Sequence, residues 1–122
     1  MRISLLALDG LFDTGLAVTI DALTAANNLS AALMGGATRF DVSIVGVRKK
    51  VRSRQGLTVP VQPVSAELKP DWVIVPALNT TTPETLIPSL QRPDVLQGKA
   101  QLLKWKDTWQ YQARHCPTKS GN

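Results

Sequence analysis

The stretch that decides the fold is Asp71-Trp72-Val73-Ile74-Val75-Pro76-Ala77-Leu78, which runs into Asn79-Thr80-Thr81-Thr82-Pro83-Glu84-Thr85-Leu86. Its first part, from Trp72 to Pro76, offers no polar face, which is typical of a strand buried on both sides of a parallel sheet. A short polar loop follows, and then a helix start with Thr82 as N-cap and Pro83 in the first helical position. Open α/β sheets place their ligand sites where a strand, a loop and a helix N-terminus meet.

Two other segments predict strands parallel to this one. Residues 2–8 and 40–47 are mostly apolar, and residues 16–34 between them carry apolar side chains at the spacing of one buried helical face. A strand, a helix and a strand in this order imply parallel pairing. A ribbon is expected at 51–61, and further helices at 83–90 and 95–105. The fold class predicted is α/β, a partial flavodoxin-like three-layer sandwich with a mostly parallel sheet.

The length of 122 residues favours one domain, and the sequence pattern places it at residues 1–106. Residues 107–122 have no clear period, which predicts an irregular tail of the kind that is often frayed or disordered. We expect no membrane segment, because no apolar run approaches the ~20 residues that span a bilayer.

The net charge of +5 is spread unevenly along the chain. Residues 1–90 carry 8 basic and 7 acidic side chains, whereas residues 91–122 carry 6 basic and 2 acidic ones. The basic run at 48–54 has no interleaved aromatic residues and no recognition helix, so we interpret it as an exposed ribbon. Direct DNA binding by this chain is therefore not expected.

The single cysteine, Cys116, cannot form an internal disulfide, so the cytoplasm is the expected location. It follows His115, and the two are a nucleophile and a base by type. Catalytic cysteines need a positioned base, which adjacent residues in a coil rarely supply. Nothing adds further metal ligands at a recognised spacing. We therefore predict no catalytic residue, no metal site and no cofactor.

Several motifs in order resemble the N-terminal portion of the ThiJ/PfpI superfamily, which has the class I glutamine amidotransferase-like fold. More narrowly, they are similar to the ligand-sensing N-terminal domain of AraC-type, GlxA-like transcriptional regulators. The resemblance covers about residues 2–105. The motifs are Leu8-Asp9-Gly10, Asp21-Ala22-Leu23-Thr24-Ala25-Ala26-Asn27, Asp71 to Leu78, Thr82-Pro83-Glu84-Thr85-Leu86 and Arg92-Pro93-Asp94-Val95.

The resemblance implies a nucleophile elbow after the helix at 95–105, but this chain departs from that pattern. Cys116 lies in Arg-His-Cys-Pro-Thr, no apolar strand precedes it, and Pro117 removes a backbone N–H where an oxyanion donor would stand. The expected acidic position of the first loop falls on Gly15, with Asp13 two residues away. We therefore expect a domain truncated before the elbow, without the DNA-binding domain of the regulators.

The function predicted is that of a non-catalytic, ligand-sensing domain fragment of an AraC-type regulator. Its candidate ligand contacts are Asp13, Asn79, Thr80 and Thr81, facing a small-molecule effector. A homo-oligomer formed through an exposed sheet edge is a further expectation. Two alternatives stay open: a cysteine-dependent hydrolase, amidotransferase or hydratase of the same superfamily, and an inactive fragment.

Overall fold

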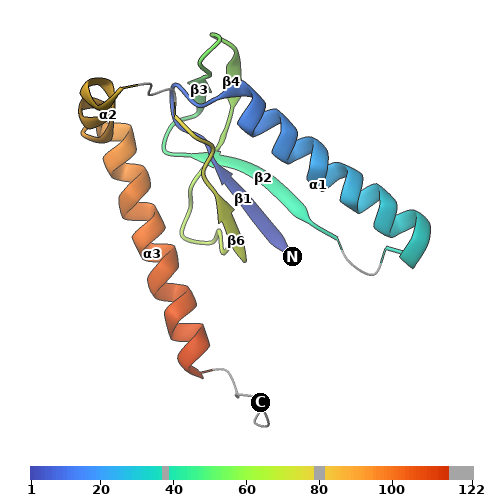
Figure 1. Cartoon of the computed structure of the whole chain (residues 1–122). Helices are drawn as coiled ribbons and strands as arrows, with labels where there is room; N and C mark the ends of the chain where they lie inside the picture. The colour runs from blue at the N-terminus through green and yellow to red at the C-terminus, as the bar shows by residue number, and fades with distance from the viewer. Residues whose placement is uncertain (37–38, 79–81, 116–122) are drawn as a thin grey trace.

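The computed structural model describes residues 1–36, 39–78 and 82–115, with their side chains as far as Trp109. The strands and helices follow one another along the chain as Figure 1 shows. Their bounds are β1 (Arg2–Leu6), α1 (Asp13–Met34), β2 (Asp41–Gly46), β3 (Lys50–Arg52), β4 (Thr58–Pro60), β5 (Gln62–Pro63), β6 (Trp72–Ile74), α2 (Pro83–Leu90) and α3 (Pro93–His115).

The main sheet has the strand order β5-β2-β1-β6, and each neighbouring pair is parallel. Strand β1 lies in the middle, where Leu5 pairs with Ile44 of β2 and with Ile74 of β6. Strands β3 and β4 form a separate antiparallel ribbon. The predicted α/β fold with a mostly parallel sheet and a side ribbon is confirmed.

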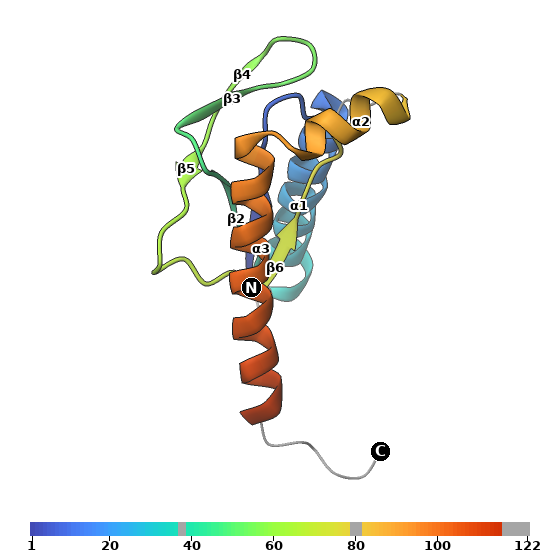
Figure 2. The ribbon, with the colours of Figure 1, turned by 90° about the vertical axis from the view of Figure 1, so that its left-hand side faces the viewer.

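The molecule has three layers, with α1 on one face of the sheet and α3 on the other (Figures 1 and 2). Successive side chains of a strand point to opposite faces, and β1 follows this rule. Ile3 and Leu5 belong to the core under α1, and Leu6 packs with Trp105 of α3. Because every residue of β1 from Ile3 to Leu6 is buried, this strand is the centre of the fold.

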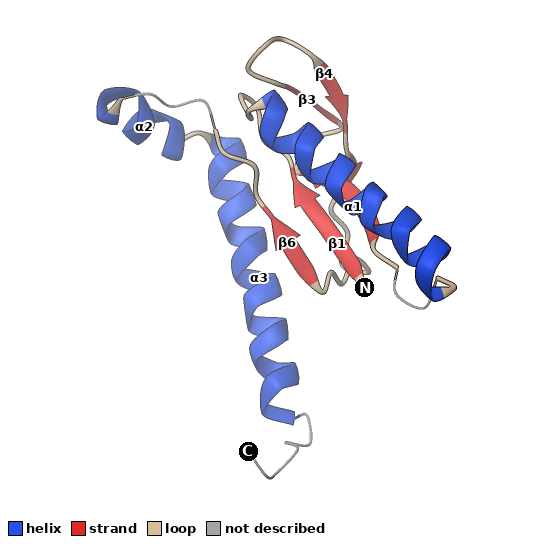
Figure 3. Ribbon diagram, turned by 45° about the vertical axis from the view of Figure 1, so that its right-hand side comes forward, coloured by secondary structure: helices blue, strands red, loops and turns tan. Residues whose placement is uncertain are grey.

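Helix α1 runs alongside the strands on its face of the sheet, in the direction opposite to β1 (Figure 3). Leu16 is buried, and Ile20 and Leu23 pack on the same core one and two turns later. At the far end, the Asn27 side chain donates to the carbonyl of Phe40 at 2.8 Å and accepts from its N–H at 2.7 Å. That pair fastens the helix to the start of β2.

The outer face of α1 is unusually apolar, with Val18, Leu29 and Leu33 all exposed. By length and composition α1 could cross a membrane. A helix at the core of a soluble protein passes the same test, so one such helix is weak evidence for a membrane.

The prediction that the strand opening the decisive stretch is buried on both faces is wrong, because the residues of β6 are exposed or only half-buried. The strand also lies at the lateral edge of the described sheet. Among the described residues, β6 pairs with β1 alone. Trp72 is 60% exposed, and Val75, which follows the strand, is 44% exposed. An apolar run shows that a strand has side chains suited to burial. It does not show whether other elements of the chain cover both faces of that strand.

The last helix is longer than predicted. The sequence predicted that the helix ends near Trp105 and that residues 107–122 are irregular, and this is wrong for residues 107–115. Trp109 follows Trp105 by one helical turn and packs into the same cluster beneath α3, which supports the extra turns. Residues 116–122 lie outside the described part, and the domain boundary at 106 stays a prediction.

Candidate functional site

The carboxyl ends of β1, β2 and β6 meet at one edge of the sheet, which we call the carboxyl edge. The loop that leaves β1 is joined there to the loop that leaves β6. The Phe12 N–H donates to the Ala77 carbonyl at 2.8 Å, and Leu11 forms an isolated antiparallel bridge with Leu78. These bonds place the N-terminus of α1 beside the segment that leads to α2.

Asp9 binds three arginines at the carboxyl edge, through its side chain and its backbone carbonyl. One carboxylate oxygen accepts from the Arg48 guanidinium at 2.8 Å, and the other accepts from the Arg52 N–H at 2.9 Å. The Asp9 carbonyl accepts from the Arg92 guanidinium at 2.7 Å. One side chain and its backbone therefore join the loop after β1, the loop after β2, the ribbon and the start of α3.

Arg92 also holds Asp94, the most buried charged side chain of the edge. Its Nε and Nη2 donate to the two Asp94 oxygens at 3.1 and 3.0 Å. The Asp94 side chain is 5% exposed, whereas that of Arg92 is 35% exposed. A bidentate pair of hydrogen bonds of this kind fixes the orientation of the guanidinium. In this orientation Nη2 donates both to Asp94 and to the Asp9 carbonyl.

Asp13, a predicted ligand contact, lies at the same edge in the first turn of α1. Its carboxylate accepts from the Ser53 hydroxyl at 2.5 Å and from the Gln55 N–H at 3.1 Å. The Ser53 hydrogen bond is the main cause that lowers the pKa of Asp13 below its usual 3.8. In this arrangement Asp13 fastens the ribbon to α1, and its role toward a ligand stays a prediction.

The ribbon has two more attachments near Asp13. The Arg54 N–H donates to the Leu11 carbonyl at 2.9 Å. The Arg54 guanidinium lies 5.2 Å from the centre of the Phe12 ring, a cation–π distance. The basic run that the sequence predicted as an exposed ribbon is thus anchored over the carboxyl edge by its own backbone and two of its arginines.

An open hollow of about 410 Å³ remains between Asp9 and the ribbon. It is lined by Arg48, Lys50 and Arg52. Arg48 is paired with Asp9, but within the described residues no acidic side chain pairs with Lys50 or with the Arg52 guanidinium. The hollow therefore carries a surplus of positive charge, which suits an acidic group on a small ligand.

The start of α2 has the predicted N-cap at Thr82, where the backbone N–H donates to the Thr85 hydroxyl at 3.3 Å. Pro83 occupies the first helical position, as predicted, and Glu84 lies in the first turn. The candidate ligand contacts Asn79, Thr80 and Thr81 lie outside the described residues.

Sequence reasoning missed Arg92 and underrated Asp9. The signal for Arg92 was its place two residues before Asp94, a spacing that lets a guanidinium fold back onto a carboxylate. Asp9 carried no such signal, because its partners lie 39 and 43 residues away in the chain. Only the folded sheet brings them together.

The described part of the chain holds neither the one cysteine nor a cluster of metal-ligating side chains. Cys116 lies outside it, and the residues that lead up to it are helical as far as His115. Across residues 1–36, 39–78 and 82–115, no three His, Cys, Asp or Glu side chains gather to hold a metal ion.

Comparison with known proteins gives a likeness of fold. No protein-family model and no curated protein matches the sequence. An AraC family transcriptional regulator from Pseudomonas putida is similar in structure, with a TM-score of 0.53 and 22% identity over 73% of this chain and 57% of that chain. The VC2308 protein has a TM-score of 0.48 and 13% identity over 79% of this chain and 43% of its own, too distant to support an argument. The chain thus has the fold of part of an AraC family regulator and spans 57% of its length.

Proposed function

We propose that this chain is the non-catalytic, ligand-sensing portion of an AraC-type transcriptional regulator in the cytoplasm. The observation that carries the proposal is the shared fold with part of an AraC family regulator. The ThiJ/PfpI-like motifs of the sequence, from Leu8-Asp9-Gly10 to Arg92-Pro93-Asp94-Val95, agree with a sensing domain of this kind. Control of transcription would need a DNA-binding domain in addition to the residues described here.

The proposed effector is a small polar metabolite with an acidic group. Its acidic group would lie between Lys50 and Arg52, which have no acidic partner among the described residues. Asp9 and Arg92 hold the surrounding loops in place, so the hollow is organised before a ligand arrives. Asp13 and the residues Asn79, Thr80 and Thr81, which lie outside the described part of the chain, remain the predicted ligand contacts.

Binding is favoured over catalysis by the sequence around the one cysteine. Cys116 is followed by Pro117, and the segment before it is helix instead of the apolar strand that precedes a nucleophile elbow. A cysteine-dependent hydrolase, amidotransferase or hydratase remains the alternative. Labelling of the Cys116 thiol at neutral pH separates the two: binding predicts the reactivity of a free cysteine, and a much faster rate would favour the enzyme.

The proposal is tested by thermal unfolding with matched pairs of compounds. Succinate and glycerol 3-phosphate carry acidic groups, and succinamide and glycerol are their uncharged counterparts. We expect small acidic compounds to raise the melting temperature, since a ligand that binds only the folded state stabilises it. The uncharged counterparts should have no effect.

Two variants test whether the stabilisation by acidic compounds arises at the carboxyl edge. Arg52→Ala removes a guanidinium that lines the hollow, and it should abolish the stabilisation by acidic compounds. Lys49→Ala removes the same charge from the same exposed run, at a residue that does not line the hollow, and should leave it unchanged. Equal loss in both variants would mean a nonspecific charge effect, and no stabilisation by any acidic compound would favour an inactive fragment.

A further inference from the structure

A second cavity lies away from the carboxyl edge, between α3 and the segment 64–71 that precedes β6. Its volume is about 380 Å³, within the usual range for small-molecule sites. Asp71, next to the first residue of β6, is one of its lining residues, so the cavity opens toward the amino end of that strand. No step of the proposed function uses it.

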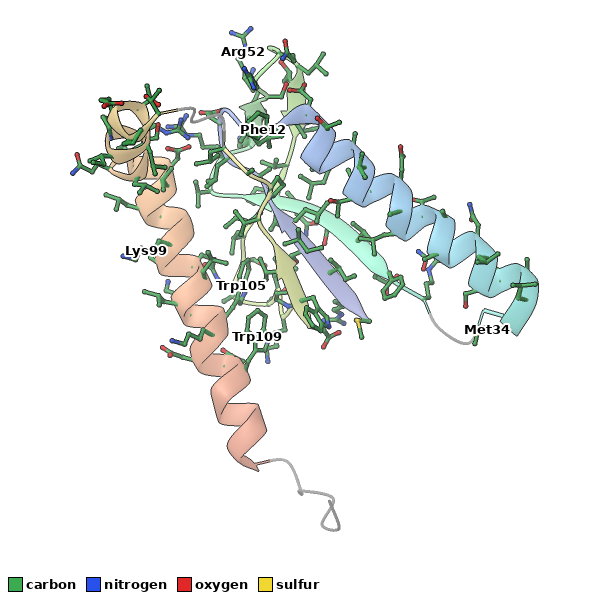
Figure 4. All side chains as sticks on the ribbon, in the orientation of Figure 1. Phe12, Met34, Arg52, Lys99, Trp105 and Trp109 are labelled. Carbon is green, nitrogen blue, oxygen red and sulfur yellow. The ribbon has the colours of Figure 1, made fainter. Side chains whose placement is uncertain are left out.

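One face of α3 forms the wall of this cavity. The lining residues of the helix recur three and four positions apart, so they share one face. Figure 4 shows Trp105 and Trp109 extending from the helix toward the sheet. The lining residues of this face are Gln101, Lys104, Trp105, Thr108 and Trp109.

The two tryptophans make the wall aromatic and hold its shape. Trp105 is 5% exposed and packs with Leu6 and Val45 of the sheet. Trp109 donates its indole N–H to the Pro70 carbonyl at 2.9 Å, which ties α3 to the segment opposite. The indole donor is thereby satisfied, and the ring beside it contributes an apolar surface to the cavity.

The rim of the cavity is positively charged. Lys69 and Lys104 both line it and are exposed, and neither forms an ion pair with a described residue. The one acidic side chain of the lining, Asp71, already accepts the Arg2 N–H at 2.7 Å. The lining thus carries two ammonium groups and one carboxylate, a net charge of +1, beside an aromatic inner wall.

We infer that this cavity is a binding site for a small, flat aromatic molecule with one negative charge. The ring stacks beside the indoles of Trp105 and Trp109, and the acidic group lies between Lys69 and Lys104. A neutral ring would gain the stacking alone, and an aliphatic acid would gain the charge alone. The inference does not depend on the proposed function, because it concerns different residues at a different place on the sheet.

The test is a titration of the full chain with 2-naphthoate, followed by the indole N–H signals in ¹H–¹⁵N NMR spectra. The protein has three tryptophans, and Trp72 lines neither this cavity nor the hollow at the carboxyl edge. We expect the signals of Trp105 and Trp109 to shift in a saturable way while that of Trp72 stays in place. The neutral analogue 2-naphthol should bind more weakly.

Two charge reversals on α3 give the matched comparison. Lys104→Glu changes a rim residue and should weaken 2-naphthoate binding roughly fivefold, as expected for an exposed charge pair turned repulsive. Lys99→Glu changes a lysine of the same helix that points away from the sheet in Figure 4 and should leave the affinity unchanged. Both side chains are exposed, so neither change disturbs the core.

Three results would overturn the inference: no shift of either indole, equal shifts of all three indoles, or equal affinities of the two variants. Shifts confined to the backbone amides of residues 52–55 would place 2-naphthoate at the carboxyl edge instead. That outcome would overturn the second site and leave the proposed function standing.

Discussion

Arg92 shows how much a single side chain contributes to the carboxyl edge. It binds both oxygens of the buried Asp94 and the carbonyl of Asp9. Arg92→Ala leaves the Asp94 carboxylate buried without its partner, so we expect a loss of roughly 1–3 kcal/mol in the free energy of unfolding. Urea denaturation measures this loss.

A matched control comes from the exposed ion pair of Arg39 with Asp41. Their side chains are 75% and 69% exposed, and the atoms are 3.5 Å apart. Exposed pairs contribute little, so Arg39→Ala should cost less than about 1 kcal/mol. Equal losses for the two variants would contradict the role assigned to Arg92.

Asp13 should make the stability of the protein depend on pH. Its pKa is lowered in the folded state by the Ser53 hydroxyl, so folding favours the ionised form. The stability that this gives is present above the unfolded pKa of 3.8 and is lost as the pH falls through the lower folded pKa. Urea denaturation between pH 2 and 6 should therefore show a steeper loss in the wild type than in Asp13→Asn.

Asp21→Asn is the control for this measurement, because Asp21 is an exposed carboxylate of the same helix. It should leave the pH dependence as it is in the wild type. An identical pH profile for Asp13→Asn and the wild type would show that the Ser53 bond does not favour the ionised form.

At the residue scale, local chemistry was predictable and distant pairing was not. The N-cap at Thr82 and the end of α1 at Gly35 follow from neighbours in the sequence, and the structure has both. The partners of Asp9 and Asp13 lie about 40 residues away, so no local pattern indicates them. They arise from the way the ribbon folds over the sheet.

Helix α3 carries a glycine, Gly98, that faces the side chains of Leu6 and Leu8. A Cβ at this position would lie 3.5 Å from Leu6 Cδ2 and from Leu8 Cδ2, an ordinary contact distance. Alanine is a better helix former than glycine by about 1 kcal/mol. Gly98→Ala should therefore raise the free energy of unfolding by roughly 0.5–1 kcal/mol, measured by urea denaturation.

The opposite result is expected at Gly46, where β2 ends. A Cβ there would lie 3.1 Å from the Ala7 carbonyl oxygen and 3.1 Å from Val61 Cγ2. The backbone cannot yield easily, so Gly46→Ala should destabilise the protein by about 1–3 kcal/mol. If both variants changed stability in the same direction, the packing described around these strands would be wrong.

At the element scale, the sequence predicted the type of most segments but not all their ends. Strand and helix periods identified β1, α1, β2 and α2 because each has an apolar pattern bounded by turn residues. The two-residue β5 was missed, since Gln62–Pro63 is exposed and, among the described strands, pairs only with β2. The end of α3 was missed because its support, Trp109, is an isolated apolar residue in a polar sequence.

At the scale of the whole molecule, β6 is the feature best suited to association with a second copy of the chain. Trp72 and Val75 are exposed at a sheet edge, and such edges can pair with a second chain. We propose that two copies associate through this edge. Trp72→Lys should then shift the protein toward the monomer in sedimentation velocity, because a lysine on an edge strand opposes pairing.

Leu57→Lys is the control for association, since Leu57 is 62% exposed but lies on the ribbon. It should leave the sedimentation behaviour unchanged. A wild-type protein that stays monomeric at all concentrations would contradict association through the edge.

The whole-molecule layout was predicted better than the site. Three apolar strands and an intervening helix determine a parallel sheet with a helix layer, because few other arrangements bury all of them. The position of β6 at the edge was not predictable, since burial depends on neighbours that an apolar run does not specify. The basic ribbon over the carboxyl edge was predicted as a ribbon but not as a wall of the site, because its anchoring bonds are long-range.

The most direct test of a ligand site at the carboxyl edge is a chemical-shift map. A compound that stabilises the protein against heat is added to ¹⁵N-labelled protein, and every backbone amide is followed. Binding in the hollow predicts shifts at residues 9–13 and 48–55 that disappear in Arg52→Ala. Shifts that fall elsewhere, or that persist unchanged in Arg52→Ala, would contradict the site.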